Sequence, residues 1–171
     1  MRLEFTDLEI NKVLDSPEDL TCLFKTIAEA PDMRIKFFNT DRCDLTSVPP
    51  DILTDALLRV QEVRAPNITA DQAQNLLTKI ATSPLMSLRC LRGFRFSARN
   101  LISVPVEILI KATMKLEDTD IRIDEYVKTP EEVQCLFKLL AASPFQNMNN
   151  ILDSFTTNIY DLSLVPPETG C

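Results

Sequence analysis

The chain contains no histidine, and it has only two glycines, Gly93 and Gly170. Hydrolases that use serine, cysteine or zinc most often recruit an imidazole as base or ligand, so the absence of histidine excludes their commonest catalytic sites. Two isolated glycines cannot form the glycine-rich loop that holds a nucleotide phosphate. We therefore expect a protein with no enzymatic activity and no cofactor.

Long apolar runs and an excess of positive charge are missing as well. No apolar run reaches the roughly 18 to 20 residues that a membrane span needs, and the first residues, Met1–Phe5, alternate polar and apolar side chains without the apolar stretch of a signal peptide. Lysine and arginine number 18 against 25 acidic residues, which gives a net charge of −7. This balance argues against nucleic acid as a general partner, since phosphate binding needs clustered cations.

The chain does contain an internal repeat. Three segments align with one another without a gap: Ser16–Pro31, Thr69–Pro84 and Thr129–Pro144. A second motif alternates with them, at Asp44–Leu53, Asn100–Leu109 and Asp161–Glu168. An internal repeat decides the architecture before any other argument. It also indicates a class of function, because repeats build surfaces more readily than catalytic clefts.

Each copy of the first segment predicts a long helix. Ser16, Thr69 and Thr129 are N-cap candidates, and Gln72 and Glu132 complete capping boxes with the two threonines. Apolar residues follow at helical spacing, and a proline ends each copy. We expect helices over Asp19–Glu29, Gln72–Thr82 and Glu132–Ala142, with Leu76 and Leu136 among the most buried residues and Leu23 close behind.

The second motif predicts a shorter helix between two strands. Its Val-Pro pair leads into short helices from about Asp51 to Leu58 and from about Glu107 to Met114. Strands are expected near Phe38, Val63, Phe94 and Ile121. Because each unit has one apolar face that it cannot bury alone, we expect these strands side by side in one parallel sheet, with the long helices stacked on one side.

The spacing Leu91-x-x-Phe94-x-Phe96, followed by Leu101, Val104 and Pro105, resembles the leucine-rich repeat family. The type it resembles is the ribonuclease-inhibitor-like one, in which longer and shorter repeats alternate. The same pattern recurs at Ile35, Phe38, Leu45, Val48 and Pro49, at Val60, Val63, Ala65 and Ile68, and at Leu152, Phe155, Leu162 and Val165. Departures occur where threonine takes an apolar position, as at Thr40.

The resemblance implies an α/β solenoid of about six repeats, formed by residues 1–171 as a single domain. In such a horseshoe arc the parallel sheet lines the concave face and the helices cover the convex face. The last Val-Pro pair is not followed by a helix, so we expect a missing C-terminal cap and an exposed apolar edge around Leu152, Phe155 and Leu162. A further repeat, a partner chain or self-association would cover that edge.

Side chains between the apolar strand positions should point outward from the concave face. The candidate partner-binding residues among them are Phe37, Arg64, Arg92, Arg95, Glu117, Asp118 and Asp120. Their opposite charges either neutralise one another across strands, for about 1 kcal/mol per pair at most, or form a docking surface for a partner that carries both charges. Phe37 is either an exposed hot spot or, in another register, a core residue.

The five cysteines are odd in number and lack the spacing of a zinc site. Cys22 and Cys135 stand at equivalent positions of two repeat copies, and the remaining copy has Asn75 there, which is unlike a disulfide position. We therefore expect reduced cysteines and a cytoplasmic protein.

The predicted function is binding of another protein through the sheet face, without catalysis and without binding to nucleic acid or membranes. The alternatives are a regulator or inhibitor that blocks the active site of an enzyme, and the ligand-sensing repeat fragment of a larger intracellular receptor of the innate-immune type.

Overall fold

The computed structural model describes residues 6–9, 16–30, 35–40, 43–65, 67–84, 93–95, 98–116 and 118–142. Within these residues five strands form one sheet: β1 Thr6–Glu9, β2 Ile35–Asn39, β3 Val60–Arg64, β4 Gly93–Arg95 and β5 Asp118–Thr119. Their order in the sheet is their order in the sequence, and every neighbouring pair is parallel. The prediction of one parallel sheet in sequence order is confirmed, but the fifth strand, expected near Ile121, ends at Thr119.

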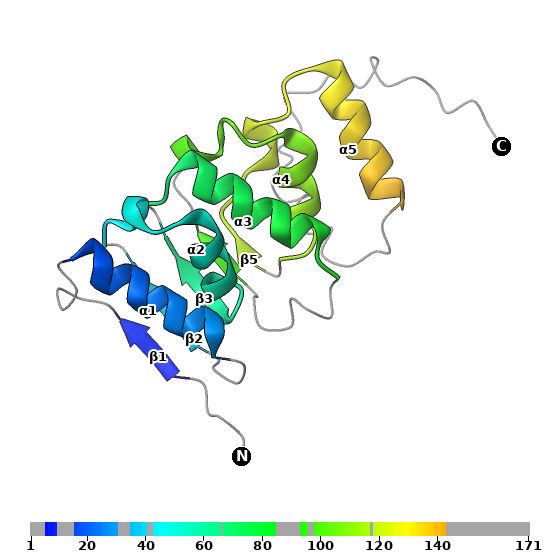
Figure 1. Cartoon of the computed structure of the whole chain (residues 1–171). Helices are drawn as coiled ribbons and strands as arrows, with labels where there is room; N and C mark the ends of the chain where they lie inside the picture. Colours follow the sequence, from blue (N-terminus) through cyan, green and yellow to red (C-terminus); the bar gives the residue numbers. More distant parts are fainter. Residues whose placement is uncertain are drawn as a thin grey trace.

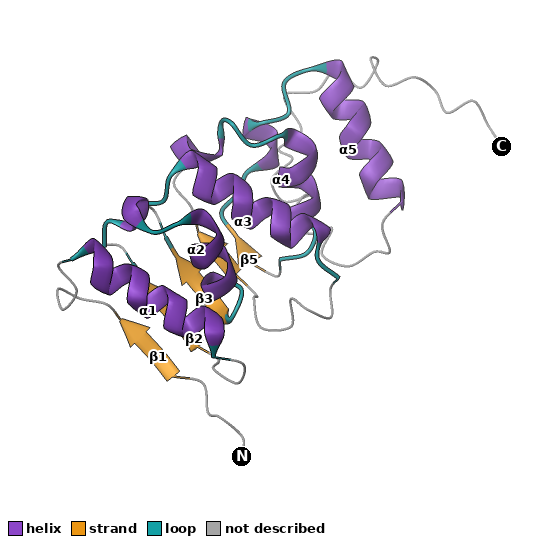
Figure 2. Ribbon diagram, in the orientation of Figure 1, coloured by secondary structure: helices purple, strands orange, loops and turns teal. Residues whose placement is uncertain are grey.

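Helices connect the strands. The α-helices are α1 Pro17–Glu29, α2 Pro50–Leu57, α3 Ala70–Thr82, α4 Val106–Thr113 and α5 Pro130–Ala142, and 3₁₀ turns lie at Leu45–Ser47, Ala98–Leu101 and Ile123–Glu125. Each helix packs against the next one along the chain, from α1 to α5 (Figure 1). The helices form one layer on one face of the sheet, and no described helix lies on the other face (Figure 2). The chain is therefore an α/β protein of two layers.

The helices alternate in length, as the two repeated motifs predict. The helices α1, α3 and α5 have 13 residues each, whereas α2 and α4 have 8 each. The short helices also begin alike. Pro49, before α2, has φ −56° and ψ 136°, and Pro105, before α4, has φ −55° and ψ 134°. The repeat in the sequence is thus a repeat of backbone structure in the described residues.

The expected N-caps are present on all three long helices. The Ser16 hydroxyl accepts from the Asp19 amide at 3.0 Å. The Thr69 hydroxyl accepts from the Gln72 amide at 3.1 Å, and the Gln72 side chain accepts from the Thr69 amide at 2.8 Å. In α5, Glu132 accepts from the Thr129 amide at 2.9 Å and donates its own amide to the Thr129 hydroxyl at 3.3 Å. Caps of this kind stabilise a helix by about 1 kcal/mol each.

Basic side chains close the other ends of α1 and α3. Arg59 donates from Nη1 to the carbonyl oxygen of Ala30 at 2.8 Å. Lys115 donates from Nζ to the carbonyl oxygens of Ala81 at 2.6 Å and of Ser83 at 2.7 Å. Carbonyls at a helix C-terminus lack partners within the helix, so a cation there satisfies them and complements the helix dipole. Each cation directly precedes a buried apolar residue, which is Val60 at the start of β3 or Leu116 shortly before β5.

The core lies between the sheet and the helices. Phe24 of α1 and Phe38 of β2 are fully buried, and their rings meet edge to face with centroids 5.5 Å apart. Leu76 and Leu136 are buried, as predicted. The prediction for Leu23 is only partly met, because this residue is half-buried while its neighbour Phe24 is covered completely. Leu23 lies at the margin of the apolar stripe of α1.

Thr40 shows how a polar residue fits an apolar position of the repeat. Its side chain is fully buried, and its hydroxyl donates to the carbonyl oxygen of Arg64 at 3.0 Å. A buried hydroxyl costs little when it is hydrogen-bonded. The expected open edge at Leu152, Phe155 and Leu162 lies outside the described residues.

Candidate binding surface

The face of the sheet that the helices leave uncovered carries polar and charged side chains. Successive strand residues point to opposite faces. In β3, Val63 is buried under the helices, whereas its neighbours Glu62 and Arg64 are exposed on the other face. In β2, Phe38 is buried in the core and Phe37 lies half-buried on the uncovered face.

The strand register arranges the uncovered face in rows. One row joins Phe37, Glu62, Gly93 and Asp118 as partners on neighbouring strands. The next row joins Asn39, Arg64 and Arg95. Residues two apart along one strand are about 7 Å apart on the same face, so the two rows are close enough for one partner segment to contact both.

A hollow lies between these rows. Its volume is about 140 Å³, and its described lining residues are Phe37, Glu62, Val63, Arg64, Gly93, Phe94 and Arg95. Gly93 contributes no side chain, so its place in the first row is empty and the backbone forms the floor. Pockets for cofactors or small substrates measure several hundred Å³. A hollow of this size therefore suits one side chain of a partner.

Both signs of charge border the hollow. Arg64 and Arg95 are cross-strand partners and both are exposed. Like charges in directly opposite positions destabilise a sheet. Glu62 is exposed two residues before Arg64 on the same strand. The aromatic ring of Phe37 completes a lining that is part apolar and part charged.

Three of the candidate binding residues, Phe37, Arg64 and Arg95, come together in this hollow. Asp120 is exposed just after β5, whereas Asp118 is placed by its backbone pairing with Gly93. Arg92 and Glu117 lie outside the described residues.

Four lining residues, Glu62, Val63, Gly93 and Phe94, were not among the candidates, and of these Glu62 and Gly93 belong to the uncovered face. The signal for the hollow was the glycine itself, because an isolated glycine inside a strand marks a place where another group approaches the backbone closely. Glu62 could have been found from its position, since it is the outward residue that pairs with Gly93.

Two carboxylates that follow β5, those of Asp120 and Glu125, lie near Tyr126. Burial raises the pKa of the Tyr126 phenol above its ordinary value, and the nearby carboxylates of Glu125 and Asp120 raise this pKa further.

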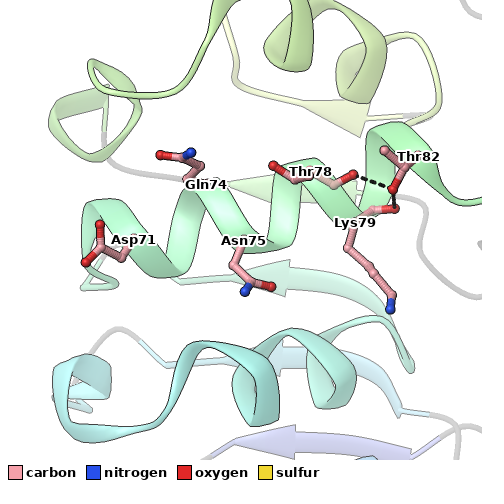
Figure 3. A pocket seen from close by; sticks show the side chains of 6 residues that line it. All are labelled: Asp71, Gln74, Asn75, Thr78, Lys79 and Thr82. Carbon is pink, nitrogen blue, oxygen red and sulfur yellow. Dashed lines mark hydrogen bonds between the residues drawn. The ribbon is translucent and has the colours of Figure 1, made fainter.

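A larger hollow of about 450 Å³ lies on the outer surface of α3, and its described lining residues are Asp71, Gln74, Asn75, Thr78, Lys79 and Thr82 (Figure 3). Several of these polar groups already have structural partners. The Asn75 amide donates to Asp51 at 2.9 Å and accepts from the Thr54 hydroxyl at 3.0 Å, which joins α3 to α2. The Thr82 hydroxyl donates to the carbonyl oxygen of Thr78 at 2.8 Å. This polar helix surface has no aromatic side chain in its described lining and is a weaker candidate.

Chemically reactive groupings are not evident in the part of the chain that the structure describes. Its residues form no cluster of three or more side chains suited to a metal ion. Its cysteines, Cys22, Cys43 and Cys135, form no disulfide, and burial raises the pKa of Cys43, which disfavours the nucleophilic thiolate. None of its helices has the length and apolar character of a membrane span.

The chain matches no protein-family model, no curated protein and no solved structure.

Proposed function

We propose that this chain is a leucine-rich-repeat solenoid of about six repeats that binds another protein through the uncovered face of its sheet. Support for the architecture comes from the alternation of 13-residue and 8-residue helices and from the parallel sheet in sequence order. Support also comes from the inward positions of Phe38, Val63 and Phe94, which occupy equivalent places on three neighbouring strands.

The observation that carries the proposed function is the hollow over Gly93. It combines an aromatic residue and two arginines on an exposed surface. Residues that contribute most to protein–protein binding are enriched in aromatic side chains and arginine, and they lie in small pockets that exclude water. A partner side chain that fills the hollow would contact Phe37 and Arg95 together.

A protein partner suits this surface better than nucleic acid does. Glu62 borders the hollow and Asp120 lies beyond it, so a phosphate backbone would meet negative charge on both sides. The net charge of −7 acts in the same direction. We further propose that the protein is cytoplasmic and acts without catalysis or cofactor.

Capture experiments with matched variants test the proposal. Phe37→Ala should abolish retention of the partner from a cell extract, whereas Gln74→Ala, on the helix side, should leave retention unchanged. Circular dichroism melting curves verify that both variants are folded. A partner that binds Phe37→Ala as strongly as the unaltered chain, or that is lost with Gln74→Ala, would place the binding surface elsewhere. If the captured partner is an enzyme, its activity with and without the chain distinguishes a regulator from a simple binding module.

A further inference from the structure

We propose that the hollow over Gly93 binds an acidic side chain from an extended segment of a partner protein, with the carboxylate held by Arg64 and Arg95. This inference rests on the proposed function, because it names the chemistry of the partner at the same surface. The arginines are exposed partners on neighbouring parallel strands, and both line the hollow.

The arrangement of the two arginines matches a carboxylate. Neighbouring strands lie about 4.8 Å apart, so two guanidinium groups in opposite positions can approach one small anion from two sides. Planar guanidinium groups bind carboxylates through paired N–H donors. Each guanidinium has five such donors, so a contact within the chain still leaves donors for a ligand.

The rest of the lining indicates what accompanies the acidic residue. Phe37 and the floor at Gly93 lie in the row adjacent to the arginines. An extended segment that runs along the strands presents every second side chain to the sheet, at a spacing of about 7 Å. An acidic residue against the arginines therefore places an apolar residue, two positions away, against Phe37.

A carboxylate fits better than a phosphorylated side chain. Glu62 is exposed beside the hollow and Asp120 lies past the arginines. Repulsion from these carboxylates grows with the charge of the ligand. A group with one negative charge gains from the arginines with less repulsion than a phosphate with nearly two. The structure thus favours an unmodified aspartate or glutamate.

A random heptapeptide library displayed on phage, selected on the folded full chain, tests the inference. We expect enrichment of Asp or Glu two positions from an apolar residue. For the best synthetic peptide, changing its acidic residue to the amide should weaken binding about tenfold or more. The double variant Arg64→Gln/Arg95→Gln should weaken the acidic peptide to the same extent and leave the amide peptide unchanged. Lys36→Gln, which removes one exposed positive charge from β2, is the control for a general loss of positive charge and should have little effect.

The outcomes separate this inference from the proposed function. Enriched peptides that lose binding on Phe37→Ala but show no acidic preference would overturn the inference and keep sheet-face binding. Peptides that bind Phe37→Ala and the double arginine variant normally, or no enrichment at all, would count against both. Stronger binding of a phosphoserine peptide than of its glutamate counterpart would overturn the choice of a carboxylate.

Discussion

The side-chain amide of Gln72 donates to the carbonyl oxygen of Val48 at 2.6 Å and so joins the start of α3 to the turn before α2. The same nitrogen donates to the carbonyl oxygen of Leu45 at 2.7 Å, while the side-chain oxygen caps the Thr69 amide. Gln72 is almost completely buried. One amide therefore serves both as a helix cap and as the link between successive units.

Gln72→Glu should destabilise the fold strongly. The new side chain keeps the cap on α3, but it loses both N–H donors and places a carboxylate against two carbonyl oxygens. An unsatisfied buried charge of this kind costs about 2–4 kcal/mol. Urea denaturation measures the free energy of unfolding. Gln74→Glu, an exposed change two residues further along α3, is the control. Equal stability of the two variants would contradict the linking role of Gln72.

Lys115→Met should weaken the end of α3. The lysine donates to three carbonyl oxygens, those of Ile80, Ala81 and Ser83, over 2.6 to 3.2 Å. Hydrogen bonds from a charged donor contribute about 1.5–3 kcal/mol to stability. We expect a loss in that range, together with faster amide hydrogen exchange in the last turn of α3.

Lys111→Met provides the comparison for this change. Lys111 is a partly exposed lysine one turn before Lys115, and it pairs with Glu107 on the surface of α4. Its loss should cost at most about 0.5 kcal/mol. If the two methionine variants are equally stable, the capping contacts of Lys115 contribute nothing specific.

The cap of α5 should make stability depend on acid pH. A hydrogen bond from the backbone of Lys128 lowers the pKa of Glu132 below its ordinary value. Burial opposes this shift in part, and hydrogen bonds from the backbone and side chain of Thr129 add to it. The ionised cap therefore stabilises the folded state above the unfolded pKa, and this contribution is lost as the pH falls through the folded pKa.

Glu132→Gln removes the titrating group and retains an acceptor, as Gln72 does in α3. The difference in unfolding free energy between the two proteins should favour the glutamate by less than about 1 kcal/mol at pH 7 and should shrink towards pH 3. If the difference in unfolding free energy between the two proteins grows as the pH falls, the expected pH dependence is wrong.

Thr113→Val should stabilise the protein. Thr113 of α4 is fully buried, and within the described residues its hydroxyl has no hydrogen-bond partner. Valine has nearly the same shape, so the change removes an unsatisfied polar group for a gain of about 1 kcal/mol. Thr54→Val in α2 is the matched control and should destabilise the protein, because the buried Thr54 hydroxyl donates to Asn75 and the change removes this hydrogen bond. Thermal unfolding of both variants measures the contrast.

Much of the fold could be predicted because its signals are local. Ser16, Thr69 and Thr129 mark the helix starts, and the spacing of apolar residues marks the buried face. The order of the strands then follows from repetition, since each unit covers the apolar face of the preceding one.

The contacts that join distant segments could not be read from the sequence. Lys115 caps a helix that ends more than 30 residues earlier, and nothing near Lys115 in the chain indicates this. The hollow could not be predicted from the sequence either. Phe37, Arg64 and Gly93 come from three different strands, and only the strand register brings them together. Outward positions could be assigned strand by strand, but the empty place between them depends on which residues become neighbours.

The absence of a side chain at Gly93 has opposite effects on the stability of the fold and on ligand binding. In a strand, alanine in place of glycine narrows the range of conformations open to the unfolded chain and stabilises the folded one by about 0.5–1 kcal/mol. The same methyl group would occupy the floor between Phe37 and Arg95. The series Gly93→Ala, Gly93→Ser and Gly93→Val places side chains of increasing size on this floor. The substitution at which ligand binding fails shows how deeply the partner's side chain reaches into the hollow. Gly93→Ala makes this measurement in a protein that is more stable than the unaltered chain.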